Sequence, residues 1–122
     1  MKPYTLLISH ESDTTALELA TAIHATEPGL YRLFFFQAGV SQLNTNCYPT
    51  SGPALAQRWA DFLRDSGIDA LACVTSALAR GVLDTAQANK LGRHPTLCEG
   101  ASLGGLGQLA DAYEHSRVVH VK

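Results

Sequence analysis

Cys73 is the residue whose setting in the sequence best fits chemical work. It lies in a short apolar run, residues 70–74, which Thr75 and Ser76 follow at the start of a helix-compatible stretch. This pattern is typical of a buried strand that delivers a cysteine to the beginning of a helix. The thiolate is the reactive form of cysteine, and the partial positive charge at a helix N-terminus lowers the thiol pKa. Cys73 is therefore a candidate nucleophile, and the alternative is a small buried apolar residue.

The cations nearest to Cys73 in the sequence are Arg80, Arg93 and His94. Each could stabilise a thiolate or a persulfide anion, and each could equally be a solvated surface charge. A hydrolase triad of Cys73, His94 and Asn89 is also conceivable, although nothing in the sequence fixes its geometry. These cations stay candidates for the neighbours of the sulfur.

The other two cysteines, Cys47 and Cys98, are widely separated from Cys73 and from each other. The sequence has no Cys-x-x-Cys pair, its five histidines are scattered, and no Cys/His spacing resembles a zinc site. We therefore expect no metal and no cofactor. Cys47 or Cys98 could supply a second thiol near Cys73, or both could be incidental.

Composition restricts the class of protein. The 122 residues suit one domain spanning 1–122, and 46% apolar with 16% charged residues is typical of a globular chain. The net charge of −2 and the lack of a Lys/Arg cluster disfavour direct nucleic-acid binding. The apolar N-terminal run is too short for a signal peptide, and no run is long enough to span a membrane. We expect a cytoplasmic protein with free thiols and no membrane contact.

The hydrophobic pattern alternates between strands and helices along the whole chain. We predict a three-layer α/β sandwich, flavodoxin-like, on a mostly parallel sheet of four or five strands. The predicted strands are residues 4–9, 30–36, 68–74, 96–98 and 117–121, and the predicted helices are 14–24, 54–66, 76–80, 85–91 and 103–115, with an irregular polar stretch at 37–53.

In open parallel sheets, ligands and chemistry gather beyond the carboxyl ends of the strands. Cys73 is predicted at that edge, which strengthens its candidacy.

Two phosphate-binding alternatives fit poorly. The residues after the first strand, 9–15, supply hydroxyls but no glycine, and the Gly-x-Gly-x-x-Ala match at 105–110 follows no clear strand and is better interpreted as a tightly packed helix start.

Three blocks of the sequence resemble the DsrE/TusD family of sulfurtransferases, in the order in which that family has them. They are residues 34–40 (FFFQAGV), 73–84 (CVTSALARGVLD) and 103–110 (LGGLGQLA), and residues 117–119 resemble the closing strand of the family. The cysteine followed by small residues and Arg-Gly-Val is the specific part. The likeness covers almost the whole chain and implies the DsrE-like form of the α/β fold.

The resemblance implies a cytoplasmic sulfur-relay subunit in which Cys73 accepts sulfane sulfur as a persulfide and passes it to a partner protein. The pathway would be tRNA 2-thiouridine synthesis or intracellular sulfur oxidation. The implied partners are related DsrE-like subunits in a heterohexamer, a TusA-like sulfur donor and a TusE/DsrC-like acceptor. Two alternatives stay open: a non-catalytic structural subunit of a DsrE-like complex, and a flavodoxin-like module that binds a small molecule.

Overall fold

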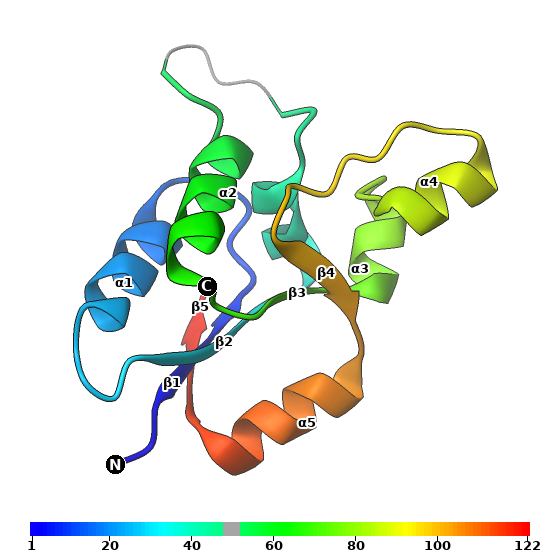
Figure 1. Cartoon of the computed structure of the whole chain (residues 1–122). Helices are drawn as coiled ribbons and strands as arrows, with labels where there is room; N and C mark the ends of the chain where they lie inside the picture. The colour runs from blue at the N-terminus through cyan, green and yellow to red at the C-terminus, as the bar shows by residue number, and fades with distance from the viewer. Residues whose placement is uncertain (48–51) are drawn as a thin grey trace.

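Five parallel strands form one sheet in the order β4-β3-β2-β1-β5. The computed structural model describes residues 1–47 and 52–122. Figure 1 shows α1 and α2 on one side of the sheet, α5 on the other, and α3 and α4 beside β4. The predicted α/β sandwich is confirmed. The elements are β1 Tyr4–Ile8, α1 Thr15–His24, β2 Leu30–Phe35, the 3-10 helix η1 Gln37–Leu43, α2 Leu55–Ser66, β3 Ala70–Cys73, α3 Val74–Ala79, α4 Thr85–Leu91, β4 Ala101–Gly104, α5 Leu106–His115 and β5 Arg117–Val121.

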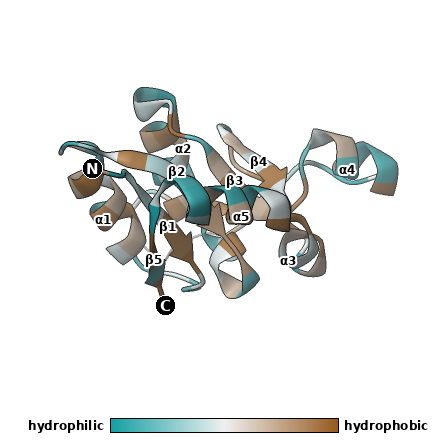
Figure 2. Cartoon of the chain, turned by 90° about the horizontal axis from the view of Figure 1, so that it is seen from below, coloured by the Kyte–Doolittle hydropathy of each residue, from teal (hydrophilic) through white to brown (hydrophobic). Residues whose placement is uncertain are grey.

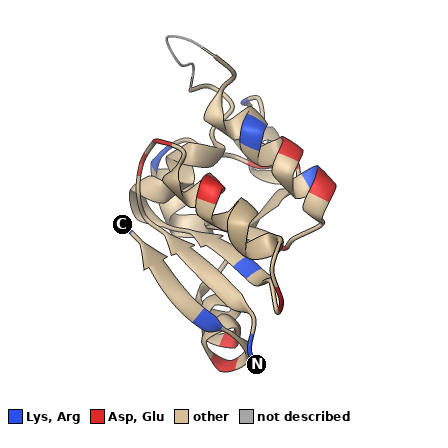
Figure 3. Ribbon diagram, turned by 90° about the vertical axis from the view of Figure 1, so that its left-hand side faces the viewer, with Lys and Arg blue, Asp and Glu red and all other residues tan. Residues whose placement is uncertain are grey.

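The larger core lies between the sheet and the two helices α1 and α2. Leu33 and Phe35 of β2 point into it and are fully buried. The Phe35 ring lies edge-on to the Trp59 ring, with 5.1 Å between the ring centroids. The outer face of α2 is charged instead, and Figure 3 shows basic and acidic residues alternating along it. Arg64 pairs there with Asp61 and with the adjacent Asp65. Within the described residues, no helix has the length and apolar character that crossing a membrane requires.

A second, smaller core lies under α5 on the opposite face of the sheet. Leu7, Phe34 and Leu71 come from three adjacent strands, and Leu109 of α5 packs against them. Phe34 is buried here while its neighbours in β2 are buried on the other face. A central strand that is covered on both faces has a nearly continuous apolar sequence, which explains the Leu-Phe-Phe run of β2.

The strand predicted at 96–98 is wrong. That segment lies away from the sheet, where the N–H of Leu97 donates to the Leu83 carbonyl and a single bridge joins Leu97 to Asn44. The real fourth strand, β4, begins at Ala101, three residues after the end of the predicted one, and pairs with β3. It follows a turn at Gly100, which has φ +92°. Its Ala-Ser-Leu-Gly sequence is too short and too weakly apolar to indicate a strand.

Three other boundaries differ from the prediction. α3 begins at Val74, directly after the cysteine, rather than at residue 76, and α5 begins at Leu106 rather than at residue 103, because residues 103 and 104 belong to β4. The stretch predicted as irregular, 37–53, begins with the regular turns of η1, and residues 48–51 of it lie outside the described residues.

η1 is pressed against the carboxyl end of β1. A methyl group at Gly39 would come within 2.0 Å of the Ile8 carbonyl oxygen, so only glycine permits this approach. The buried side chain of Gln42 holds η1 in place, because its amide donates to the His10 carbonyl at 2.8 Å and its oxygen accepts from the Trp59 indole at 2.9 Å.

A polar cluster fastens α5 to β2. The Arg32 guanidinium donates to Asp69 at 2.7 Å, to Asp111 at 3.2 Å and to the Gln108 carbonyl at 2.6 Å. The Tyr31 hydroxyl donates to the same Asp111 carboxylate at 2.6 Å. This hydrogen bond is the first cause of a pKa of Asp111 below its ordinary value, and His115 and Arg32 add to the effect.

We expect Gly39→Ala to destabilise the protein by about 3 kcal/mol or more, because the methyl group forces η1 away from β1. Gly107→Ala is the matched control, since a methyl group there meets nothing within 4 Å and the residue lies inside a helix. It should be neutral or stabilising by about 0.5–1 kcal/mol. Urea unfolding of the two variants measures both values, and equal stability would contradict the close approach.

The stabilisation from Asp111 should depend on pH. Its pKa in the folded protein lies below the unfolded value, so the contribution is present above the unfolded pKa of about 3.8 and is lost as the pH falls through the folded pKa. We expect the gap in Tm between the wild type and Asp111→Asn to be widest near neutral pH and to close in acid. A gap that is constant from pH 7 to acid would show that the carboxylate charge is not what stabilises α5.

Candidate active site

Cys73 lies where β3 ends and α3 begins. It is the last residue of the strand and the N-cap residue of the helix, with φ −56° and ψ 122°, and its side chain is partly exposed. The sequence pattern predicted this position at the strand-to-helix junction. Because all strands are parallel, Cys73 lies at the edge of the sheet that also carries Phe36 and Gln37 after β2.

The neighbours of Cys73 on the sheet are apolar or small. Cys73, like Phe36 and Leu109, packs against the buried residues of the smaller core. Gly104 of β4 is its partner across the strand pair, and a methyl group there would come within 3.1 Å of Leu71. The absence of a side chain at Gly104 leaves the sulfur without a bulky neighbour on that side.

The pKa of Cys73 lies below the ordinary value of a thiol. Burial is the largest single influence and raises the pKa, but hydrogen bonds from the backbone N–H of Ser76, the Ser76 hydroxyl and the backbone N–H of Thr75 together outweigh it. α3 has only six residues, so these local donors rather than a long helix dipole stabilise the thiolate.

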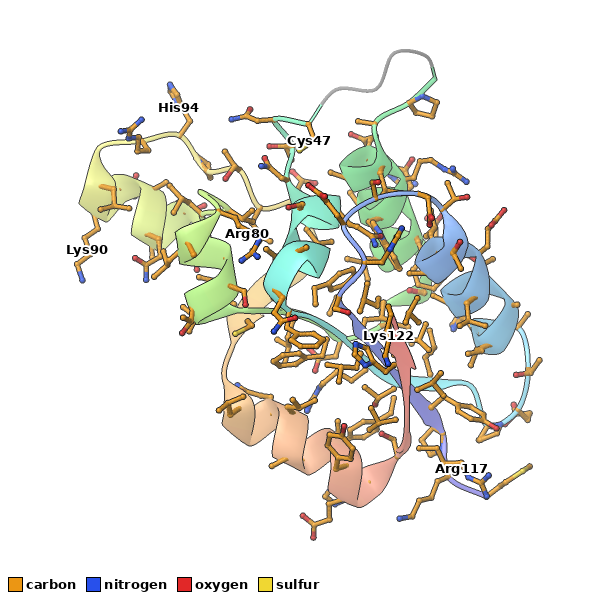
Figure 4. The ribbon with its side chains drawn as sticks, turned by 180° about the vertical axis from the view of Figure 1, so that it is seen from behind. Cys47, Arg80, Lys90, His94, Arg117 and Lys122 are labelled. Atoms are coloured by element: carbon orange, nitrogen blue, oxygen red, sulfur yellow. The ribbon has the colours of Figure 1, made fainter. Side chains whose placement is uncertain are left out.

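Of the three candidate cations, only Arg80 reaches the helix that carries the site. Its guanidinium lies 3.5 Å from the Ser76 carbonyl, and in Figure 4 its side chain is turned back between α3 and η1. Arg93 and His94 are exposed beyond α4, and Figure 4 shows His94 pointing outward with Lys90 at the far end of that helix. Figure 2 shows α4 as largely hydrophilic. None of the three is a cause of the lowered pKa of Cys73.

The other two thiols have different settings, and all three cysteines are free. Cys98 is buried, and burial raises its pKa to about 12, so it is held as a neutral thiol. Cys47 is exposed shortly after η1, at the top of Figure 4. Within the described residues, no group of three or more His, Cys, Asp or Glu side chains gathers in a way that could hold a metal ion.

The loop after β1 borders a cavity of about 770 Å³. Ser12, Thr14 and Cys47 line it together with Arg58 of α2, and Cys73 is not among its lining residues. The hydroxyl-rich loop considered as a phosphate site thus faces a space separate from the cysteine.

The glycine-rich block at 105–110 does follow a strand, β4, contrary to the prediction. Its first amide is already used, because the Gly105 N–H donates to the Gln108 side-chain oxygen at 2.8 Å. This arrangement agrees with the interpretation of the block as a helix start.

Sequence reasoning missed Gln37. This residue has φ +50°, a left-handed conformation that is uncommon for a residue other than glycine. Its backbone N–H donates to the Ser76 hydroxyl oxygen at 2.8 Å. No feature of the sequence indicates this, because the unusual residue is neither glycine nor asparagine and its contact is with a residue 39 positions away.

Comparison with known proteins agrees with this fold. A family model described as DsrE/DsrF-like matches residues 2–121. A protein of Pseudomonas aeruginosa strain PAO1 named "Sulfurtransferase TusD homolog" is 36% identical over 104 residues, which cover 80% of this chain and 76% of that protein. "Sulfurtransferase TusD" of Enterobacter sp. strain 638 is 36% identical over 101 residues, covering 81% and 79%.

The crystal structure of the ychN protein from E. coli superposes with a TM-score of 0.74 over 99% of this chain and 100% of that chain, at 22% identity. That likeness shows the fold. Fold and site together define an α/β protein with a free thiol of lowered pKa at the carboxyl edge of a parallel sheet. The chain belongs to the DsrE/DsrF-like family, which confirms the resemblance seen in the sequence.

Cys73 should react with iodoacetamide at a lower pH than a small model thiol does, because its pKa lies below the ordinary value and the thiolate is the nucleophile. Cys98 should not react in the folded protein, since its thiol is buried and its pKa is about 12. Rates for each cysteine come from mass spectrometry of peptides after timed quenching across a pH series. A Cys73 midpoint at or above that of the model thiol would contradict the hydrogen-bonded thiolate.

Proposed function

We propose that this protein is a sulfurtransferase that carries sulfane sulfur as a persulfide on Cys73. The observation that carries the proposal is a partly exposed thiol of lowered pKa at the edge of the sheet, in a chain of the DsrE/DsrF-like family. The names of the two curated relatives support it, since both are called sulfurtransferases. The chemistry requires only thiols, so neither a metal nor a cofactor takes part.

In the loading step, the Cys73 thiolate attacks the outer sulfur of a persulfide on a donor protein. A bond forms between the Cys73 sulfur and that outer sulfur, while the S–S bond of the donor breaks and its electron pair leaves on the donor cysteine as a thiolate. The outer sulfur keeps its proton. In the second step an acceptor thiolate attacks the same sulfur, and Cys73 leaves as a thiolate. Both steps conserve electrons, so no external oxidant or reductant is required.

Two exposed apolar side chains support a protein as the partner rather than a small molecule. Leu78 of α3 is 41% exposed and Leu106, the first residue of α5, is 75% exposed. Both belong to elements that begin at the sheet edge where Cys73 lies. Exposed apolar residues beside a reactive group are typical of a surface that docks another protein.

For the pathway, we propose the TusD branch, in which the relay ends in 2-thiouridine of tRNA, because both curated relatives carry the TusD name. The family resemblance implies a TusA-like donor, a TusE/DsrC-like acceptor and a heterohexamer with related DsrE-like subunits in the cytoplasm. The net charge of −2 suits a protein that exchanges sulfur with other proteins and does not bind tRNA itself.

Incubation with a persulfidated TusA-like carrier should add the mass of one sulfur atom to the peptide that contains Cys73, and a reductant should remove it. Cys73→Ser should abolish the addition. The matched control is Cys47→Ser, which changes an exposed thiol that the proposal does not use and should leave the label on Cys73. Peptide mass spectrometry reads the position of the sulfur, and label on Cys47 or Cys98 alone would overturn the proposal.

A further inference from the structure

β5 is an edge strand whose outer side is open. It pairs with β1 alone, in a continuous register from Arg117 opposite Tyr4 to Val121 opposite Ile8. In Figure 3 it is the outermost strand, and no ribbon of the part of the chain that the structure describes runs beyond it. The other edge strand, β4, is shorter and has α3 and α4 beside it in Figure 1. β5 is therefore the edge of the sheet that another strand can reach.

The backbone groups of β5 are divided between β1 and the open side. The Arg117 N–H donates to the Pro3 carbonyl at 2.8 Å, and the Val121 carbonyl accepts from the Ser9 N–H at 3.0 Å. Backbone hydrogen-bonding groups alternate from one side of a strand to the other along its residues. The odd-numbered residues of β5 therefore bond to β1, and the even-numbered ones, Val118 and His120, present their N–H and C=O groups outward.

β5 lacks the usual features that keep an edge strand from pairing. It contains no proline and no bulge, and its one Lys or Arg residue, Arg117, stands at its first position. Its central residue, Val119, is 38% exposed although it is apolar. An extended edge with unpaired backbone groups and an exposed β-branched side chain is a template for a further strand.

We propose that β5 is a docking surface for a second copy of this chain, which pairs with it edge to edge as an antiparallel strand about a twofold axis at Val119. In this register Val118 of each copy lies opposite His120 of the other, and each of these two pairs exchanges both of its hydrogen bonds. Every outward N–H and C=O of the two residues then has a partner. Val119 faces Val119 of the second copy at the close spacing of a pair without hydrogen bonds.

Charge at the two ends of β5 favours a second copy as the occupant. Figure 4 shows Arg117 and Lys122 at opposite ends of the strand. The exposed Glu114, near the end of α5, lies beside the beginning of β5, and the exposed Glu11 belongs to the loop that starts beside its end. An antiparallel copy brings the beginning of one strand to the end of the other. Arg117 of each copy then approaches Glu11 of the other, and Lys122 approaches Glu114, so opposite charges meet at both ends.

The pairing leaves Cys73 open. In the order of the sheet, β3 is separated from β5 by β2 and β1, which corresponds to roughly 14 Å at the usual spacing of strands. Because the two copies run antiparallel, their carboxyl edges lie on opposite sides of the joined sheet. Both cysteines stay accessible to other proteins, and this inference goes beyond the proposed function without depending on it.

The test is the molar mass of the whole protein, measured by analytical ultracentrifugation over a dilution series. We expect the wild type to approach twice the mass of the chain at the highest concentrations. Val119→Lys should weaken dimerisation by at least about tenfold, because two like charges face each other across the twofold axis. Val119→Thr is the matched control, since it keeps the β-branched shape and should stay within about threefold of the wild type. Urea unfolding checks that each variant is folded.

A charge exchange at the same position tests the register. Val119→Glu alone should be as weak a dimer as Val119→Lys, whereas an equal mixture of the two folded variants should dimerise, because opposite charges then meet at the axis. This result requires that residue 119 faces itself. A monomeric wild type, a Val119→Lys variant that dimerises like the wild type, or a mixture that stays monomeric would each overturn the proposal.

Discussion

The contact between Gly39 and the Ile8 carbonyl is the constraint on which the site depends. It brings η1 directly onto the carboxyl end of β1, closer than any side chain would allow. The buried Gln42 then ties η1 to the first loop and to Trp59. From this fixed position, the first residue of η1 places its N–H on α3. The geometry around the cysteine is therefore set from a neighbouring element and not by β3 and α3 alone.

Cys98 and Cys73 show how the same fold gives one type of side chain different chemistry. Cys98 sits in the larger core, where the effect of burial on its pKa exceeds that of its one backbone hydrogen bond, so its thiol is kept neutral. Cys73 is only partly buried, and the free N–H groups of a helix start lie beside it. Two backbone donors and one hydroxyl are sufficient to reverse the effect of burial there, without help from Arg80, Arg93 or His94.

Sequence patterns predicted the fold well wherever apolar residues recur regularly. β2 and α2 were recognisable because their buried positions are large and apolar, and Cys73 could be located because a short apolar run precedes it. β4 could not, since an edge strand of four residues with Leu103 as its one large apolar side chain carries almost no pattern. The link between Gln37 and Ser76 was equally hidden, because it depends on a backbone angle and on a contact across 39 residues. The reactive cysteine could be located from the sequence, but the residues that surround it in space could not.

Among the described residues, α5 is the helix that covers the face of the sheet on which the Cys73 side chain packs, and its polar anchors to Arg32 begin at Gln108 and are completed at Asp111. The turn before them starts at the exposed Leu106. Free energies of local opening are lowest where few buried contacts hold a segment. The polar anchors therefore hold the middle of α5, whereas its first turn is held by the Gln108 cap on the Gly105 N–H and by the packing of Leu109. Local opening of this helix should accordingly begin at that turn while the sheet stays intact.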